Sequence, residues 1–248
     1  MNARTYAATV RRVLAQLVAD RRTLALIMAI PTALLILLYF VYYDYPGAGA
    51  LFNRIAVSMM AILPMIVMFL VTSVTMLRER GSGTLERLWT TPLHRADLLL
   101  GYATAFTTIA VGQSLILCAV AAWFLDVAIA ASWAWVILTA LIDAFLGVAM
   151  GLFVSAFART EFQAVQFMPV VIGPQIFLCG LLVARDQLPR ALELCSNVLP
   201  MSWAVDAVGE LTVSTTPTAD FAADVGLLAA AGLAVLTIAA LTVPRRTR

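Results

Sequence analysis

The chain has 248 residues, of which 62% are hydrophobic and only 12% are charged, and its formal net charge is +2. Because an ordinary soluble domain is roughly a quarter charged, this composition excludes a water-soluble globule and predicts an all-α polytopic membrane protein. No soluble part large enough to carry out chemistry on its own is expected.

The first 22 residues predict an amphipathic helix. Apolar side chains recur at helical spacing from Tyr6 to Val18, and arginines occupy other positions around the helix. Such a helix lies along a membrane surface with its apolar stripe towards the lipid. The alternative is a basic tail that only fixes the orientation of the chain.

Six segments are near or above the roughly 20 apolar residues that cross a bilayer. They are residues 23–43, 55–77, 98–125, 133–158, 162–184 and 225–243. Prolines at positions 31, 64, 169 and 174 are tolerated within spans, because neighbouring helices can supply hydrogen-bond partners for the backbone groups that proline leaves unpaired. An even number of spans places both termini on the same side of the membrane.

Arginine placement predicts which side that is. All sixteen basic residues are arginine, and thirteen of them fall on the side of the termini. Since basic residues are enriched in cytoplasmic segments, residues 1–22, 78–97 and 244–248 are predicted to be cytoplasmic, and residues 44–53 and 185–222 external. The expected location is the bacterial inner membrane. No basic run interleaved with aromatic residues stands apart from the spans, so nucleic-acid binding is not expected.

Asp143 is the single charge in the fourth predicted span. A carboxylate at that depth costs roughly 2.5–3.5 kcal/mol, so Asp143 is predicted to face protein or a hydrated cavity rather than lipid. Two roles remain open for it: a hydrogen bond in helix packing, or the coupling carboxylate of an ion- or proton-coupled secondary transporter.

Several kinds of catalytic site are excluded by composition. A P-loop requires a lysine that reaches the phosphates, and the sequence contains no lysine. The single histidine, His94, and the three widely spaced cysteines cannot form a metal site or a disulfide framework. Any ATP hydrolysis that drives this protein must therefore take place on another chain.

The segment between the second and third spans predicts a short charged helix under the membrane. Gly81 and Gly83 permit a sharp reversal at low steric cost. Thr91 followed by Pro92 is typical of a helix N-cap with proline at the first helical position. A solvated loop is the alternative.

The segment 185–222 is too amphipathic for a seventh span. It predicts two short helices broken at Pro200 that dip into the outer leaflet. Non-helical backbone at that depth must be buried in protein or line a wet cavity.

Two stretches resemble the permeases of type-two ABC exporters, a family of drug, lipid and polysaccharide exporters. The first stretch contains Glu79, Gly83-Thr84-Leu85-Glu86, Leu88 and Thr91-Pro92-Leu93. The second contains Leu188-Pro189 and Leu199-Pro200-Met201-Ser202-Trp203-Ala204-Val205-Asp206, and it is similar to the external re-entrant segment of the family. Gly209 departs from the family pattern, because relatives often have arginine there.

The resemblance implies one permease domain over residues 1–248, which pairs with itself or a sister permease and with two separate ATPase subunits. This chain would bind no cofactor and would not be an enzyme, since ATP and Mg²⁺ would be bound by the ATPase. The ATPase-coupling residues would be Glu79, Arg80, Gly83, Thr84, Leu85, Glu86 and Arg87. Pro189, Pro200, Trp203 and Asp206 would belong to the re-entrant segment.

The expected cargo is a hydrophobic drug or lipid-like molecule, because the spans lack the charges and aromatic residues that suit a polysaccharide. A secondary transporter using Asp143 is the alternative, and a scaffold protein without transport is a third. Secondary transporters commonly repeat their halves, but residues 125–248 contain no counterpart of the segment 79–93.

Overall fold

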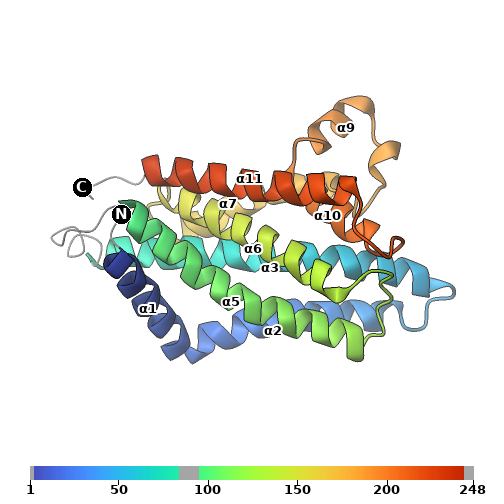
Figure 1. The fold of residues 1–248 in the computed structure, drawn as a ribbon, viewed down its shortest axis with the longest axis horizontal. Helices are drawn as coiled ribbons and strands as arrows, with labels where there is room; N and C mark the ends of the chain where they lie inside the picture. The colour runs from blue at the N-terminus through green and yellow to red at the C-terminus, as the bar shows by residue number, and fades with distance from the viewer. Residues whose placement is uncertain (1–2, 84–94, 243–248) are drawn as a thin grey trace.

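The computed structural model describes residues 3–83 and 95–242, and every regular element in these ranges is a helix. Among the described residues, five helices are long and apolar enough to cross a membrane, and they run side by side along one axis (Figure 1). They are α2 (Arg21–Tyr42), α3 (Ala48–Gly81), α5 (Arg95–Trp123), α6 (Trp133–Ser155) and α11 (Ala219–Thr242). The prediction of an all-helical membrane protein is confirmed.

Shorter helices complete the described fold. They are α1 (Ala3–Ala19), α7 (Glu161–Val171), α8 (Gly173–Leu178), the 3₁₀ turn Arg185–Gln187, α9 (Arg190–Ser196) and α10 (Pro200–Glu210). In Figure 1, α1 lies across one end of the bundle and α9 projects from the other end.

The predicted fifth span, residues 162–184, is not one continuous helix but contains α7 and α8 in succession. Thr160 caps α7, because its Oγ1 accepts a hydrogen bond from the Gln163 amide at 3.1 Å. Pro174 lies in the first turn of α8, where its missing N–H costs nothing, whereas in a continuous helix it would remove a backbone hydrogen bond. By contrast, Pro31 and Pro64 lie inside the unbroken helices α2 and α3.

The two ends of the bundle differ in the segments that meet there. The C-terminal ends of α3 and α11 and the N-terminal ends of α1 and α5 gather at one end, which we call the Glu79 end (Figure 1). The other end holds the start of α3 and the segment from the 3₁₀ turn to α10, and we call it the Arg54 end. The two termini of the helical bundle thus lie at the same end.

Helices α3 and α6 approach each other closely at two glycines. A Cβ added to Gly147 would lie 2.3 Å from the Met65 carbonyl oxygen, and one added to Gly151 would lie 2.6 Å from the Phe69 carbonyl oxygen. Glycines four residues apart share one helix face and allow two membrane helices to approach closely. These two glycines therefore hold α3 and α6 together as the centre of the bundle.

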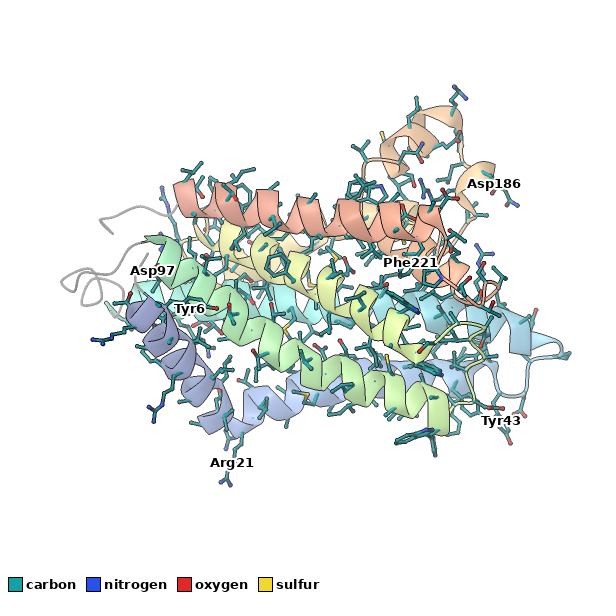
Figure 2. All side chains as sticks on the ribbon, viewed as in Figure 1. Tyr6, Arg21, Tyr43, Asp97, Asp186 and Phe221 are labelled. Atoms are coloured by element: carbon teal, nitrogen blue, oxygen red, sulfur yellow. The ribbon has the colours of Figure 1, made fainter. Side chains whose placement is uncertain are left out.

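The outer helices leave large apolar surfaces uncovered. In the apolar 18-residue stretch of each helix, about 72% is buried in α3, but only 17% in α2 and 22% in α11. Figure 2 shows side chains of α2 and α11 pointing away from the other helices. Because the hydrophobic effect opposes exposure of such faces to water, they fit a lipid or protein environment.

Candidate functional site

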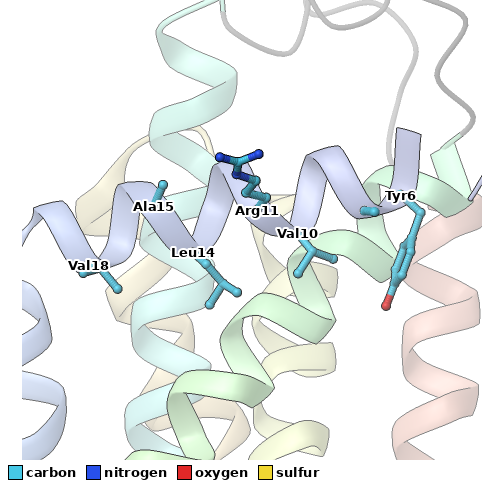
Figure 3. A pocket seen from close by; sticks show the side chains of 7 residues that line it. Tyr6, Val10, Arg11, Leu14, Ala15 and Val18 are labelled. Carbon is cyan, nitrogen blue, oxygen red and sulfur yellow. The ribbon is translucent and has the colours of Figure 1, made fainter. Parts of the chain in front are cut away.

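The candidate site is the Glu79 end, where helix α1 packs against α3 and α5. Thr9, Val13 and Leu17 are buried there, and a Cβ added to Gly101 of α5 would lie 2.6 Å from Thr9 Cγ2. Figure 3 shows Val10 and Leu14 on one side of α1 and Arg11 on the opposite side, facing away from the bundle. The buried residues of α1 thus recur every four positions on one face of the helix, and that face packs against the bundle.

Glu79 of α3 lies at the centre of a polar network that joins three helices. Its carboxylate accepts hydrogen bonds from Arg12 Nη1, at 3.3 Å to each oxygen, and from Gln16 Nε2 at 3.2 Å. Arg12 Nη2 also donates to the Tyr102 hydroxyl at 2.7 Å, and its guanidinium stands 5.7 Å from the centre of the Tyr102 ring. The Glu79 side chain is only 10% exposed, so its charge is directed into the protein.

The two neighbours of Glu79 contact other helices. Arg78 makes a bidentate ion pair with Glu161 at the start of α7, with Nε to Oε1 at 2.8 Å and Nη2 to Oε2 at 2.9 Å. These hydrogen bonds from Arg78 hold the pKa of Glu161 below its usual range. Arg80 donates to the Ser155 carbonyl oxygen at the end of α6. Three consecutive residues thus tie the end of α3 to α7, to α1 with α5, and to α6.

Helix α3 ends in a glycine-dependent turn. The Ser82 amide donates to the Arg78 carbonyl oxygen at 2.9 Å, and Gly83 follows with φ +71°. This left-handed conformation is the common way for a helix to end, and glycine adopts it without steric strain. Helix α3 therefore ends at the two glycines, with Gly81 as its last residue. The sharp reversal predicted there stays a prediction, because residues 84–94 lie outside the described residues.

The remaining predicted coupling residues, Thr84, Leu85, Glu86 and Arg87, lie outside the described residues. The short charged helix predicted in this segment therefore stays a prediction.

Asp143 lies in the middle of α6 and is completely buried. Neither of its carboxylate oxygens has a hydrogen-bond partner among the residues that the structure describes. The residue faces protein rather than the outer surface, as its position in the sequence predicts, but the hydrogen bond expected for a packing role is absent from the described ranges.

The segment 185–222 contains two short helices, one on each side of the predicted break at Pro200. Pro189 immediately precedes α9 and Pro200 is the first residue of α10. The Trp203 indole N–H donates to the Asn197 carbonyl oxygen at 3.0 Å, and Asp206 makes an ion pair with Arg185.

One face of α10 is deeply buried: its buried residues are Met201, Ser202, Ala204, Val205, Ala207 and Val208. The helix packs against α3, α6 and α11 rather than standing in solvent.

Arg12, Gln16 and Tyr102 are site residues that sequence reasoning missed. Arg12 is one of the thirteen arginines that predict the cytoplasmic side of the chain. That count does not indicate that its side chain contacts other helices. A partial signal was available, because Arg12 and Gln16 are four residues apart and so share one face of a helix. Their shared partner Glu79 is 63 or more residues away in sequence, so only the packing of α1 reveals the network.

Comparisons with known proteins agree with this architecture. Residues 4–211 match the family model described as ABC-2 type transporter. The chain is 28% identical to the probable multidrug ABC transporter permease YbhR of Escherichia coli over 154 residues, which covers 62% of this chain and 42% of that protein. It is 27% identical to the linearmycin resistance permease protein LnrN of Bacillus subtilis over 169 residues, covering 67% of this chain and 42% of the relative.

A eukaryotic relative is also found: ABC transporter G family member 20 of Dictyostelium discoideum is 28% identical over 141 residues, covering 57% of this chain and 19% of that protein. Each match covers less than half of the relative's own length. The family model, however, covers most of this chain, and the chain belongs to the ABC-2 type transporter family.

Proposed function

We propose that this chain is the membrane-spanning permease subunit of an ATP-driven exporter. ATP and Mg²⁺ are bound by separate ATP-binding cassette subunits, and a second permease copy or a sister permease completes the pathway. The cargo is a hydrophobic, drug-like or lipid-like molecule, in keeping with the names of the multidrug and linearmycin resistance relatives.

The proposed topology has six crossings, with α7 and α8 together forming the fifth. Contacts at both ends of α3 support this count. Glu161 at the start of α7 pairs with Arg78, and the Gly180 carbonyl oxygen just after α8 accepts from Arg54 at 3.2 Å. Arg54 and Arg78 are separated by about 36 Å along α3 at the rise of an α-helix, which exceeds the roughly 30 Å of a hydrocarbon core.

In this topology the Glu79 end faces the cytoplasm at the inner membrane. Helix α1 lies along the inner surface, and the ATPase contacts residues 84–94 within the predicted cytoplasmic segment 78–97. Residues 185–222 form the external re-entrant segment, whose α10 is held against the bundle. The termini and the thirteen flanking arginines are then cytoplasmic, as expected from the distribution of positive charge.

The observation that carries the proposal is the set of contacts made by Arg78, Glu79 and Arg80. These residues lie at the start of the stretch that resembles the family, and they link α3 to α1, α5, α6 and α7. A displacement applied by an ATPase to residues 84–94 would therefore reach five helices at once. Glu79 acts in this scheme as an internal anchor rather than as a surface contact, because its carboxylate is occupied by Arg12 and Gln16.

The test is a charge reversal within the proposed contact. Glu86→Arg is expected to leave the permease inserted and folded, but to reduce binding of its cognate ATPase, stimulated ATP hydrolysis and export. Hydrogen bonds to charged groups contribute about 1.5–3 kcal/mol, which corresponds to a roughly 10- to 150-fold loss of ATPase affinity. Pull-down of the ATPase and its turnover in proteoliposomes measure the effect.

The matched control is Glu193→Arg, which makes the same charge change in α9 at the opposite end of the molecule. It should leave ATPase binding unchanged. If Glu86→Arg assembles with the ATPase, hydrolyses ATP and exports as the parent does, the coupling role of this segment is refuted. A secondary transporter that uses Asp143 would instead export without any ATPase, and membership in the ABC-2 family does not favour it.

A further inference from the structure

A groove of about 580 Å³ lies inside the angle between α1 and α2, with α3 as its back wall. Figure 2 marks the corner of this angle at Arg21. Glu79 and Gln16 border the groove, whereas Arg12 and Tyr102 are not among the residues that line it. Its volume is within the roughly 300–1,000 Å³ of typical ligand pockets.

The lining of the groove changes from polar to apolar along α3. At the Glu79 end it is lined by Gln16, Asp20 and Arg78, and deeper in the bundle by Leu26, Leu70 and Val74. From Ser82 to Leu70 the groove follows twelve residues of α3, or about 18 Å. Under the proposed topology the groove extends from the inner headgroup region to about the middle of the hydrocarbon core, because the whole core is roughly 30 Å thick. An amphiphile aligned with the membrane normal matches this gradient.

The polar end presents charges of both signs. Asp20 caps α2, with Oδ1 accepting from the Thr23 amide at 3.1 Å and Oδ2 from the Thr23 hydroxyl at 2.7 Å. Those hydrogen bonds from Thr23, together with the nearby charge of Arg78, hold the pKa of Asp20 below its usual range, so it is ionised at neutral pH. Within the described residues Asp20 has no ion-pair partner. Arg78 uses Nε and Nη2 for Glu161 and leaves Nη1 outside that pair.

We propose that this groove binds a zwitterionic phospholipid of the inner leaflet, of the phosphatidylethanolamine class. Its ammonium group lies at Asp20, its phosphate at Nη1 of Arg78, and one acyl chain along Leu26, Leu70 and Val74. An anionic phospholipid lacks the ammonium group, so it would leave the Asp20 carboxylate unpaired beside a second negative charge. The bound lipid fills the space between the α1–α2 corner and α3, and so holds α1 in position for the Glu79 network. The proposal rests on the membrane placement given above, but not on export.

The test uses the purified full chain in mild detergent without ATPase or cargo. Phosphatidylethanolamine or phosphatidylglycerol is added, retained lipid is measured by mass spectrometry after washing, and the thermal unfolding midpoint is recorded. The parent protein should retain and be stabilised by phosphatidylethanolamine in preference to phosphatidylglycerol. Asp20→Asn should lower that preference about two- to fivefold, the range expected for loss of one exposed ion pair. Asparagine is an equally good N-cap, so α2 itself is preserved.

A second variant tests the apolar part of the groove. Val74→Trp fills it and should reduce retention of both lipids. The controls are Asp44→Asn and Val213→Trp, which make the same replacements at exposed positions outside the groove, and both should retain lipid as the parent does. Equal retention of the two lipids by the parent, an unchanged preference in Asp20→Asn, or undiminished retention in Val74→Trp would each overturn the proposal.

A resident lipid must also be distinguished from a transported one. In proteoliposomes with the ATPase, ATP should not accelerate movement of labelled phosphatidylethanolamine to the opposite leaflet. Acceleration that Val74→Trp abolishes would identify the lipid as cargo and overturn the assignment as a resident lipid. Loss of export activity alone leaves the lipid measurements unaffected, so failure of the proposed function and failure of this site are separable.

Discussion

Among single residues, Asp143 carries the clearest energetic cost. It is completely buried in α6, and its carboxylate has no hydrogen-bond partner among the described residues. An unsatisfied polar group in such a place costs about 1–3 kcal/mol. The depth of Asp143 could be predicted from its position in the span, but the absence of a partner in the described ranges could not, because partners come from other helices.

If Asp143 has a packing role alone, replacing it with a neutral side chain should not impair the protein. Asp143→Asn should retain ATP-driven export, and Asp143→Leu should raise the free energy of unfolding by about 1–3 kcal/mol, because a buried unsatisfied group is removed. Export assays in proteoliposomes and thermal unfolding in detergent measure the two effects. Asp220→Asn, at an exposed carboxylate of α11, serves as the control. Loss of export in a stably folded Asp143→Asn variant would assign a functional role to the carboxylate.

Gly83 offers a second prediction for a single residue. Its φ of +71° is disfavoured for side chains with a Cβ and most strongly for β-branched ones, so Gly83→Val should strain the turn by about 1–2 kcal/mol. ATPase binding and stimulated hydrolysis should fall, while membrane insertion persists. Gly81→Val, two residues earlier in helical backbone with open space around its Cβ position, should have a smaller effect. Equal behaviour of the two variants would contradict the role assigned to the turn.

Among elements, α3 and α6 form the contact that two glycines make close. Gly147 and Gly151 form a G-x-x-x-G pattern in the sequence, which is a recognised signal for close helix packing. The pattern identifies a contact face on α6 but not the helix that occupies it. The structure shows that the partner is α3, with the backbone carbonyls of Met65 and Phe69 against the two glycines.

Adding one methyl group at this contact should separate the helices. Gly147→Ala places a Cβ where the Met65 carbonyl oxygen now lies, and we expect a loss of about 1–3 kcal/mol in the free energy of unfolding, as found for overpacked cores. Gly226→Ala in α11 is the matched control, since nothing lies within 4 Å of its Cβ position. It should be neutral or stabilising, because alanine has the higher helix propensity. Thermal unfolding of both variants in the same detergent tests the contact, and equal stability would contradict it.

At the scale of the whole molecule, the described helices fit the proposed orientation. The Glu79 end and the Arg54 end are separated by the length of α3, and the helices that bear the termini end together at the Glu79 end (Figure 1). Single-cysteine variants in a background without Cys118, Cys179 and Cys195 test which end faces outwards. In intact cells an impermeant maleimide should label Val213→Cys. It should label Ser82→Cys only after the membrane is opened, and the reverse pattern would overturn the orientation.

The sequence by itself determined the features that depend on local composition. A run of about 20 apolar residues favours a membrane helix through its composition alone, and five of the six predicted spans are found as long helices. Proline at position 200 begins α10 for a local reason, because its fixed φ and missing N–H suit the first turn. The left-handed conformation at Gly83 was likewise predictable, since only glycine adopts it without strain.

Tertiary structure alone decided which side chains meet. From the sequence Glu79 is equally consistent with a contact to an ATPase and with a local brace of the turn, and only the fold brings Arg12 and Gln16 of α1 to its carboxylate. The break between α7 and α8 also became visible only in the fold, since a proline within a span can equally be accommodated as a kink. The physical reason is the same in both cases. Composition and periodicity fix the free energy of placing a segment in lipid, whereas a polar group inside that segment takes whichever partners helix packing brings within hydrogen-bonding distance.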